Sequence, residues 1–554
     1  MAKTKTTKAT KIQKLFGATA YSEATTRNYE GAPAFVRGNE EQLVRVLMTG
    51  NFEHTYYASD AELAGEAIGL FRHFAATDPH FLAQAIVYAR AEGLMRIAPI
   101  TALVVLSAAD SADAKELFRR IFSRVILTPG DLQDVIALCR RSALRGMGKA
   151  VTRAANRWLA GISQYHVVKY GSESQQISLR DIYRMTRPKL SGEANAIARY
   201  VVKGEVAQEL TQIAGYEEFK RTARSLAGGQ GAGGSSLSDE ARAAAEARVL
   251  ALIGEYRLPW EVVAGQVIPS RAVWERLLYD MPYMALLRNL NNMVKYGVTD
   301  SAEALDYITR TLADPQRVAS GKQLPFRYFS AIKALKAEGA VGTALREALS
   351  AALELSFANM PELGRRVLVA NDISGSMSSR PSPRSDMTMG EIAGIFAAAV
   401  YKKAESGEIV SFDTVAHPRA VSKRQGVAEI AQAVSGNGGG TSLAAPLEYA
   451  FKFRKGQAHI FDTAVFITDS ESWYDHLTRT RGVLDEIREY RKRVRPDLKC
   501  FFVQLLPYKH AVVPESEPGC YYIYGWSGAV LGYIASMVSS GASQVEAVKK
   551  VSML

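Results

Sequence analysis

The chain has 554 residues, 47% of them apolar, and 68 Lys and Arg against 56 Asp and Glu give a net charge of +12. This length predicts two to four domains with sizeable cores. The apolar runs are far shorter than the roughly twenty residues of a membrane span, and none follows the amino-terminal lysines, so we expect a soluble protein without a secretory signal.

The first 360 residues are expected to be helical. Residues 1–14 carry five lysines and no acidic residue, so residues 1–20 are predicted to be a flexible basic arm. From Glu40 onward, apolar residues recur at three-and-four spacing, and no strand is expected before about residue 365. We therefore predict a domain of stacked helical repeats over residues 21–363, interrupted by a flexible glycine loop at 228–236.

Residues 140–190 hold eleven basic residues and two acidic ones. Two basic stripes follow from helical spacing. The first consists of Arg145, Lys149, Arg153 and Arg157. The second consists of Arg180, Arg184 and Arg187, on a helix that should start at the Ser178-x-x-Asp181 capping box and end at Pro188. One basic helix face can simply be exposed to solvent. Two such faces with almost no acidic residues nearby repel each other unless a polyanion neutralises their charge, so the pattern favours binding of nucleic acid.

The remaining residues, 364–554, alternate between strand and helix patterns. Strands are expected near 365–370, 408–413, 461–468 and 498–506, and Thr388-x-x-Glu391 should cap a long helix that ends near Ala404. This alternation predicts a doubly wound α/β sheet. The fold class expected for the whole chain is thus α followed by α/β.

A D-x-S-x-S motif follows the first of these strands. It supplies Asp372, Ser374 and Ser376, while Thr441 lies in a glycine-rich loop and Asp469 follows another buried strand. Ligand sites of such sheets lie at the carboxyl ends of the strands, and an all-oxygen set suits Mg²⁺ or Mn²⁺. The alternative is a capped helix start that binds no metal.

These five residues, in this order, resemble the metal-ion-dependent adhesion site of von Willebrand factor A domains. Segments 169–188, 281–290 and 324–328 resemble the TROVE module of the Ro ribonucleoprotein autoantigen family, in which an A domain follows. The resemblance implies a ring of HEAT-like helical repeats next to a Rossmann-like A domain.

The same resemblance implies a role in RNA quality control or in the stress response. Small non-coding Y RNAs would bind the basic outer surface, and single-stranded 3′ ends of misfolded or decaying RNAs would enter the central hole. Lys169 matches a lysine that contacts Y RNA, but Arg187 stands where vertebrate members carry a histidine. Bacterial relatives suggest a partner exoribonuclease such as polynucleotide phosphorylase.

An enzyme is not expected. The sequence offers no carboxylates for a second metal, no Walker lysine and no histidine beside a nucleophile. If the protein were an enzyme, a Mg²⁺-dependent nuclease would be the activity to test for first. Besides an RNA-binding protein and an enzyme, the third functional class considered is a Mg²⁺-dependent protein-adhesion scaffold. Such a scaffold would not need the basic stripes. Three cysteines without C-x-x-C spacing predict a reducing, cytoplasmic setting with no disulfide framework.

Overall fold

The structure is a computed structural model of the chain. It describes residues 24–29, 32–50, 59–140, 147–171, 177–228, 238–267, 269–358, 363–381, 385–452, 460–472, 482–525 and 543–553. The predicted basic arm, the glycine loop after Gly228 and Arg145 lie outside these residues.

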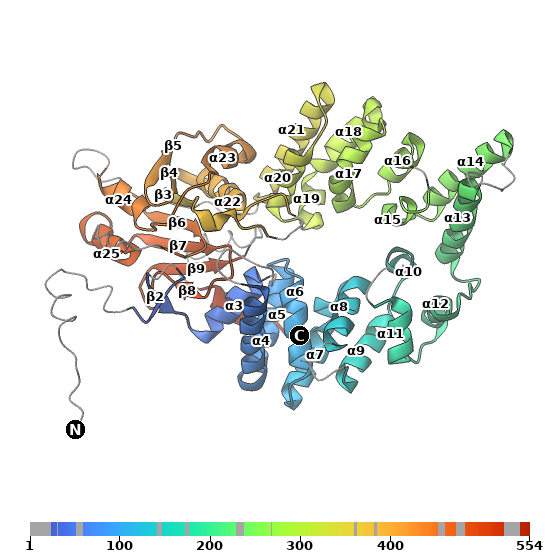
Figure 1. The fold of residues 1–554 in the computed structure, drawn as a ribbon, viewed down its shortest axis with the longest axis horizontal. Helices are drawn as coiled ribbons and strands as arrows, with labels where there is room; N and C mark the ends of the chain where they lie inside the picture. The colour runs from blue at the N-terminus through green and yellow to red at the C-terminus, as the bar shows by residue number, and fades with distance from the viewer. Residues whose placement is uncertain are drawn as a thin grey trace.

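The helices form two arms that run side by side from the sheet-containing domain (Figure 1). The first arm comprises α3 (Asn39–Thr49), α4 (Asp60–Thr77), α5 (Pro79–Ala91), α6 (Ile97–Ser107), α7 (Ala112–Val125), α8 (Pro129–Arg140), α9 (Lys149–Leu159), α10 (Gln164–Tyr170), α11 (Leu179–Thr186) and α12 (Gly192–Lys203). The second comprises α15 (Trp260–Val263), α16 (Arg271–Leu278), α17 (Tyr283–Lys295), η1 (Val298–Asp300), α18 (Ala302–Leu312), α19 (Pro315–Gly321), α20 (Pro325–Ala334) and α21 (Gly339–Ser356). Helices α13 (Thr211–Gly228) and α14 (Asp239–Glu255) join the arms at the far end.

Several helices begin at side-chain caps that the sequence provides, as at α4, α7 and α11. The Ser178 hydroxyl accepts a hydrogen bond from the Asp181 amide, and the Asp181 carboxylate accepts one from the Ser178 amide, so the predicted capping box is present at α11. Consecutive helices pack against each other, which confirms the stacked helical architecture. In the described part of the chain, no helix is both long and apolar enough to cross a membrane.

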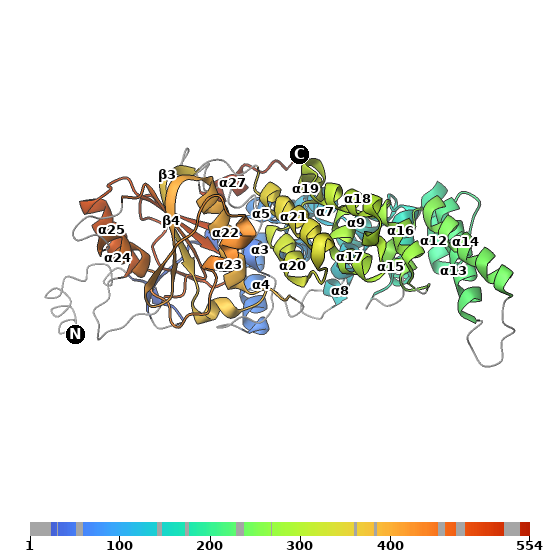
Figure 2. The same cartoon turned by 90° about the horizontal axis from the view of Figure 1, so that it is seen from above.

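The described part of residues 363–553, called the A domain below after the predicted resemblance, contains a six-stranded sheet in the order β5-β4-β3-β6-β7-β9. Its strands are β3 (Leu363–Asp372), β4 (Ala404–Phe412), β5 (Ala416–Arg419), β6 (Thr463–Thr468), β7 (Lys499–Gln504) and β9 (Cys520–Tyr524), and only β5 runs antiparallel. Helices α22 (Met389–Lys403) and α23 (Val427–Val434) cover one face, and α24 (Ala445–Lys452) and α25 (Val483–Arg493) cover the other (Figure 2). The predicted doubly wound sheet is confirmed.

One prediction about strands is wrong. Two strands precede residue 365: β1 (Thr26–Arg27) pairs with β2 (Pro33–Val36), and β2 pairs with β8 (His510–Ala511) of the A domain. These strands are too short to show an alternating pattern, and β2 finds its second partner near the opposite end of the sequence. The amino-terminal segment is therefore part of the A domain surface.

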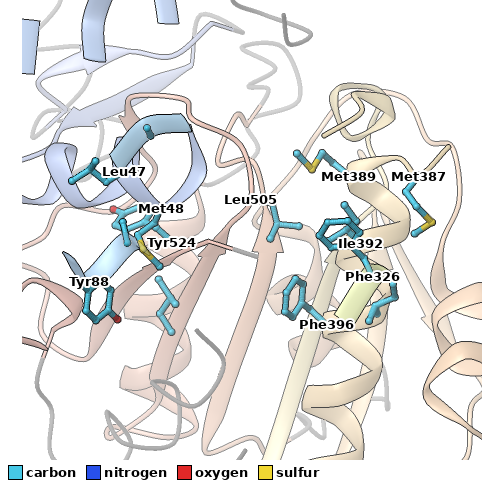
Figure 3. Packing of buried hydrophobic residues seen from close by; sticks show 14 of the residues in the cluster. Leu47, Met48, Tyr88, Phe326, Met387, Met389, Ile392, Phe396, Leu505 and Tyr524 are labelled. Atoms are coloured by element: carbon cyan, nitrogen blue, oxygen red, sulfur yellow. The ribbon is translucent and has the colours of Figure 1, made fainter. Parts of the chain in front are cut away.

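Both ends of the helical segment contact the A domain, which closes a ring. Figure 3 shows Met48 of α3 near Tyr524 of β9, and Phe326 of α20 near Ile392 and Phe396 of α22. The carboxyl-terminal helix α27 (Gln544–Lys549) adds to the first contact, because the Gln84 amide donates to the Lys549 carbonyl at 2.7 Å. One continuous apolar core thus links the arms to the sheet.

Arg37 lies at the centre of what we call the closure contact, the meeting of the first arm with β7, β8 and β9. Its side chain is fully buried. It donates hydrogen bonds to Gln504 Oε1 at 2.6 Å, to the His510 carbonyl at 2.7 Å and to the Tyr524 hydroxyl. The guanidinium carbon also lies 4.1 Å from the centroid of the Tyr522 ring.

We expect Arg37→Ala to lower the free energy of unfolding by about 3 kcal/mol, since buried acceptors would lose their donor. Chemical denaturation measures this change. The matched control is Lys549→Ala, because Lys549 pairs with Glu40 at 2.7 Å at the same junction but is about half exposed. That variant should lose less than about 1 kcal/mol. Equal losses in both variants would contradict the central role of Arg37.

Candidate metal site and RNA-binding surface

The predicted metal-binding residues meet where β3 and β6 end. Strand β3 lies between β4 and β6 in the sheet. The chain continues from β3 to β4 on one side, and the later strand β6 lies on the other side, so the site is at a topological switch point. The Ser374 amide donates to Asp372 Oδ1 at 2.9 Å, and the Ser374 and Ser376 hydroxyls lie 3.2 Å apart. The Thr468 hydroxyl donates to Asp372 Oδ2 at 2.6 Å, which ties the two loops together.

A glycine-rich loop brings Thr441 to the same place. The Gly438 amide donates to the Ile373 carbonyl at 2.6 Å, and the Gly375 amide donates to the Gly439 carbonyl at 2.9 Å. A Cβ atom on Gly438 would lie 2.6 Å from Cβ of Asp413, so the close approach requires glycine. The structure therefore brings Asp372, Ser374, Ser376, Thr441 and Asp469 together, all of them buried.

The electrostatics of the cluster favour a bound cation. Burial raises the pKa of Asp372 to about 6, and burial together with the Asp372 carboxylate raises the pKa of Asp469. Oxygen Oδ2 of Asp469 is buried and has no hydrogen-bond partner among the described residues. Two buried carboxylates with three hydroxyls, and no sulfur or imidazole, match the donor set that Mg²⁺ prefers. The residues present thus fit a hard divalent cation.

The part of the chain that the structure describes contains no group of three His, Cys, Asp or Glu side chains able to hold a metal ion. A cation at this site would accordingly be held by two carboxylates and by hydroxyl groups. Mg²⁺ takes six ligands and the cluster offers five side chains, so such a site would leave at least one coordination position for water or for an acidic group of a partner.

The two basic stripes lie on neighbouring helices. Lys149, Arg153 and Arg157 are exposed on α9, and Arg184 is exposed on α11. The Asn156 side chain of α9 donates to the Thr186 carbonyl of α11 at 3.2 Å, which holds the helices together. The buried faces include Ala154 and Leu159 of α9 and Leu179, Ile182 and Tyr183 of α11.

Three predicted RNA-binding residues differ from the expected arrangement. Arg180 is half-buried, and its Nε donates to the Val201 carbonyl at 3.2 Å. Arg187 does not share the face of α11, because it lies past the helix end with a left-handed φ of 46° before Pro188. Lys169 forms an ion pair with Glu261 at 3.2 Å, which connects α10 to α15 of the other arm.

Sequence reasoning missed a pair of basic residues outside the two stripes. Arg288 of α17 and Arg327 of α20 line a cavity of about 340 Å³ that also receives Leu94 from the first arm. Burial and the charge of Arg288 lower the pKa of Arg327, so the two cations lie close together. Both occur in the segments 281–290 and 324–328, yet their helical spacing does not reveal that they meet between the arms.

These features define a class of protein in which a helical ring is completed by a von Willebrand A-type domain. That domain carries a D-x-S-x-S cluster at the switch point of its sheet. The chain belongs to the TROVE family of Ro proteins. Residues 47–344 match the TROVE domain, and residues 366–538 match the Ro60 vWA domain.

Two relatives agree with this assignment, and one solved structure shares the fold. The chain is 27% identical to the RNA-binding protein RO60 of Deinococcus radiodurans over 81% of this chain and 84% of that protein. It is 25% identical to the RNA-binding protein RO60 of Caenorhabditis elegans over 51% of this chain and 44% of that protein. The crystal structure of the D. radiodurans RO (RSR) protein superposes with a TM-score of 0.62 at 20% identity, covering 90% of this chain and 99% of that one.

We expect Mg²⁺ to raise the thermal midpoint of the natural protein, because a ligand that binds only the folded state stabilises it. Asp469→Asn should abolish this shift, and Asp372→Ala should abolish Mg²⁺ binding in calorimetry. Without divalent cations, Asp469→Asn should be at least as stable as the natural protein, since the amide removes repulsion between buried carboxylates.

The control is Asp386→Asn, which removes the same charge from an exposed position on the loop after the D-x-S-x-S motif. It should keep the full Mg²⁺ shift. A shift of equal size in Asp469→Asn would rule out this cluster as the cation site.

Proposed function

We propose that this protein binds small structured RNAs on its outer basic surface. The observation that carries the proposal is that α9, with Lys149, Arg153 and Arg157 exposed, lies beside α11, with Arg184 exposed. The surrounding region, residues 140–190, has eleven basic and two acidic residues. Each Lys or Arg that meets a phosphate releases condensed counterions. The names of the two relatives, both called RNA-binding proteins, point to the same activity.

The chemistry of the surface suggests what kind of RNA it takes. Side chains cannot read the deep, narrow major groove of helical RNA, so contacts fall on the backbone and on loops. Stem-loop RNAs of the Y type, with weak sequence preference, fit this surface. Lys169 would contribute only if phosphate displaced Glu261, because the ion pair already satisfies its charge.

Single-stranded 3′ ends are proposed to bind between the arms. Arg288 and Arg327 face the same cavity, and two adjacent cations favour a bridging phosphate. The Arg327 guanidinium also lies 5.3 Å from the Phe326 ring centroid, so it is partly held in place before an anion arrives. A structured RNA with a single-stranded tail would engage both surfaces, which suits a cytoplasmic role in RNA quality control or stress.

The A domain is proposed to recruit a protein rather than to catalyse a reaction. Asp372, Ser374, Ser376, Thr441 and Asp469 would hold Mg²⁺ or Mn²⁺, which when bound would supply a coordination position for an acidic residue of a partner. RNA cleavage would then be the task of an associated exoribonuclease, such as polynucleotide phosphorylase. A Mg²⁺-dependent adhesion scaffold without RNA remains the second candidate, favoured by the same cluster.

Reversing Arg153, Arg157 and Arg184 to Glu should weaken stem-loop RNA binding strongly and reduce the dependence on salt. The slope of log affinity against log salt should fall by about 0.7 to 0.9 for each lost phosphate contact. Filter binding or fluorescence anisotropy over a salt series measures both. Circular dichroism should be unchanged, because the apolar faces of α9 and α11 remain intact.

A second triple reversal provides a charge-matched control. Arg242, Arg271 and Arg310 are exposed on other helices and ion-paired with Glu246, Glu275 and Asp306. Their reversal to Glu changes the net charge by the same amount, but should affect RNA affinity much less. If both triples lose the same affinity, binding depends on overall charge and the stripes are not the site.

The double variant Arg288→Ala, Arg327→Ala should lose affinity for a single-stranded tail while it keeps affinity for a blunt stem-loop. Competition between tailed and tail-less forms of one RNA separates the two effects. The charge-matched control is the double variant Arg310→Ala, Arg317→Ala, which removes two exposed arginines of α18 and α19 on the same arm. Equal loss for both RNAs in the Arg288, Arg327 variant would remove the cavity from the proposed path of the 3′ end.

A further inference from the structure

Two cysteines far apart in sequence lie opposite each other in the sheet of the A domain. Cys500 of β7 and Cys520 of β9 are register partners in a parallel ladder. Neighbouring strands are about 4.8 Å apart, which is within the Cα separation that a disulfide spans. The next register pair on the same face of the sheet shows that side chains meet across these strands, since the rings of Phe502 and Tyr522 stack with centroids 5.1 Å apart.

The two thiols differ in their surroundings. The Cys500 side chain is wholly buried. Atom Nη2 of Arg491 lies 3.6 Å from Sγ of Cys520. The Cys500 thiol and then the Arg491 charge lower the pKa of Cys520, whereas burial raises the pKa of Cys500. Cys520 is thus the better nucleophile of the two, and Cys500 is placed to react with it.

Cys520 is only 7% exposed, but the residue lies at the wall of a cavity. This cavity of about 570 Å³ lies at the junction of α3, β9 and α27. The cavity is lined by five glutamates, Glu40, Glu41, Glu515, Glu517 and Glu546, and by the cation Lys549. This acidic lining disfavours anionic oxidants such as oxidised glutathione, but admits a small neutral hydroperoxide.

We propose that Cys520 and Cys500 form a reversible thiol pair that responds to hydroperoxides. The Cys520 thiolate attacks one oxygen of hydrogen peroxide, the O–O bond breaks, and the departing hydroxide takes up a proton to leave as water, giving a sulfenic acid. Sulfur of Cys500 then attacks sulfur of Cys520, the S–O bond breaks, and the Cys500 proton leaves with the hydroxide as a second water. Two thiols are oxidised by two electrons, and one peroxide is reduced to two waters.

The position of the pair gives oxidation a structural consequence. Tyr522 and Tyr524 follow Cys520 on β9 and contact Arg37 in the closure contact. A Cys500–Cys520 disulfide would fasten β9 to β7 beside this contact. The predicted reducing setting is compatible with such a pair, because the dithiol would be the resting form.

The test uses the full-length reduced chain treated with hydrogen peroxide. Of its three free cysteines, all buried, only Cys139 should remain open to alkylation after the treated protein is denatured. Peptide mapping should show the Cys500–Cys520 link, and dithiothreitol should restore three thiols. Cys139 is an internal control, since burial raises its pKa to about 11.

Two variants separate the steps. In Cys500→Ser, a dimedone reagent should trap sulfenic acid at Cys520, whereas Cys520→Ser should give no trapped product at Cys500. Oxidised glutathione should form the disulfide more slowly than an equal concentration of peroxide. The proposal is overturned if all three thiols of the unmodified sequence survive peroxide, if Cys139 is lost as fast as the pair, or if oxidation yields only links between molecules.

Discussion

The ring depends on one constraint, which is that both ends of a long helical segment must contact the same small sheet. The closure contact meets this requirement with a fully buried guanidinium that bonds to groups of β7, β8 and β9. Contacts at the other end are apolar, where Phe326 lies against α22, and are reinforced by the ion pair between Lys402 and Glu354. Because both contacts involve the A domain, its placement controls the spacing of the two arms.

The amino-terminal segment also links the closure contact to the candidate metal site. The Tyr29 amide donates to Glu471 at 2.8 Å, and the Asn28 side chain donates to the Ser472 carbonyl at 2.7 Å. Both acceptors lie in the loop that continues from Asp469. A single loop therefore carries a residue of the candidate metal site at one end and contacts the β1–β2 segment at the other. The metal site is thus connected by direct hydrogen bonds to the segment that leads into the first arm.

Local patterns predicted much of this molecule, since they act over a few residues. The capping boxes at Ser178 and Thr388 start helices as expected, and apolar runs located the four strands β3, β4, β6 and β7 along the chain. The five oxygen groups could be gathered because parallel strands end at one edge. Features that depend on distant pairing were missed, such as β2 with β8 and Arg288 with Arg327. Arg187 was misplaced because helical spacing was continued up to Pro188, whereas α11 ends at Thr186 and Arg187 is its left-handed C-cap.

The central claim is that RNA lies across α9 and α11 and reaches into the space between the arms. Ultraviolet crosslinking of the RNA that copurifies with the protein from its own cells, followed by peptide mapping and sequencing, tests it most directly. The account predicts crosslinked peptides from α9, α11 and the Arg288–Arg327 cavity, and a stem-loop RNA with a single-stranded end. Crosslinks confined to the A domain, or no RNA above a background control, would contradict it.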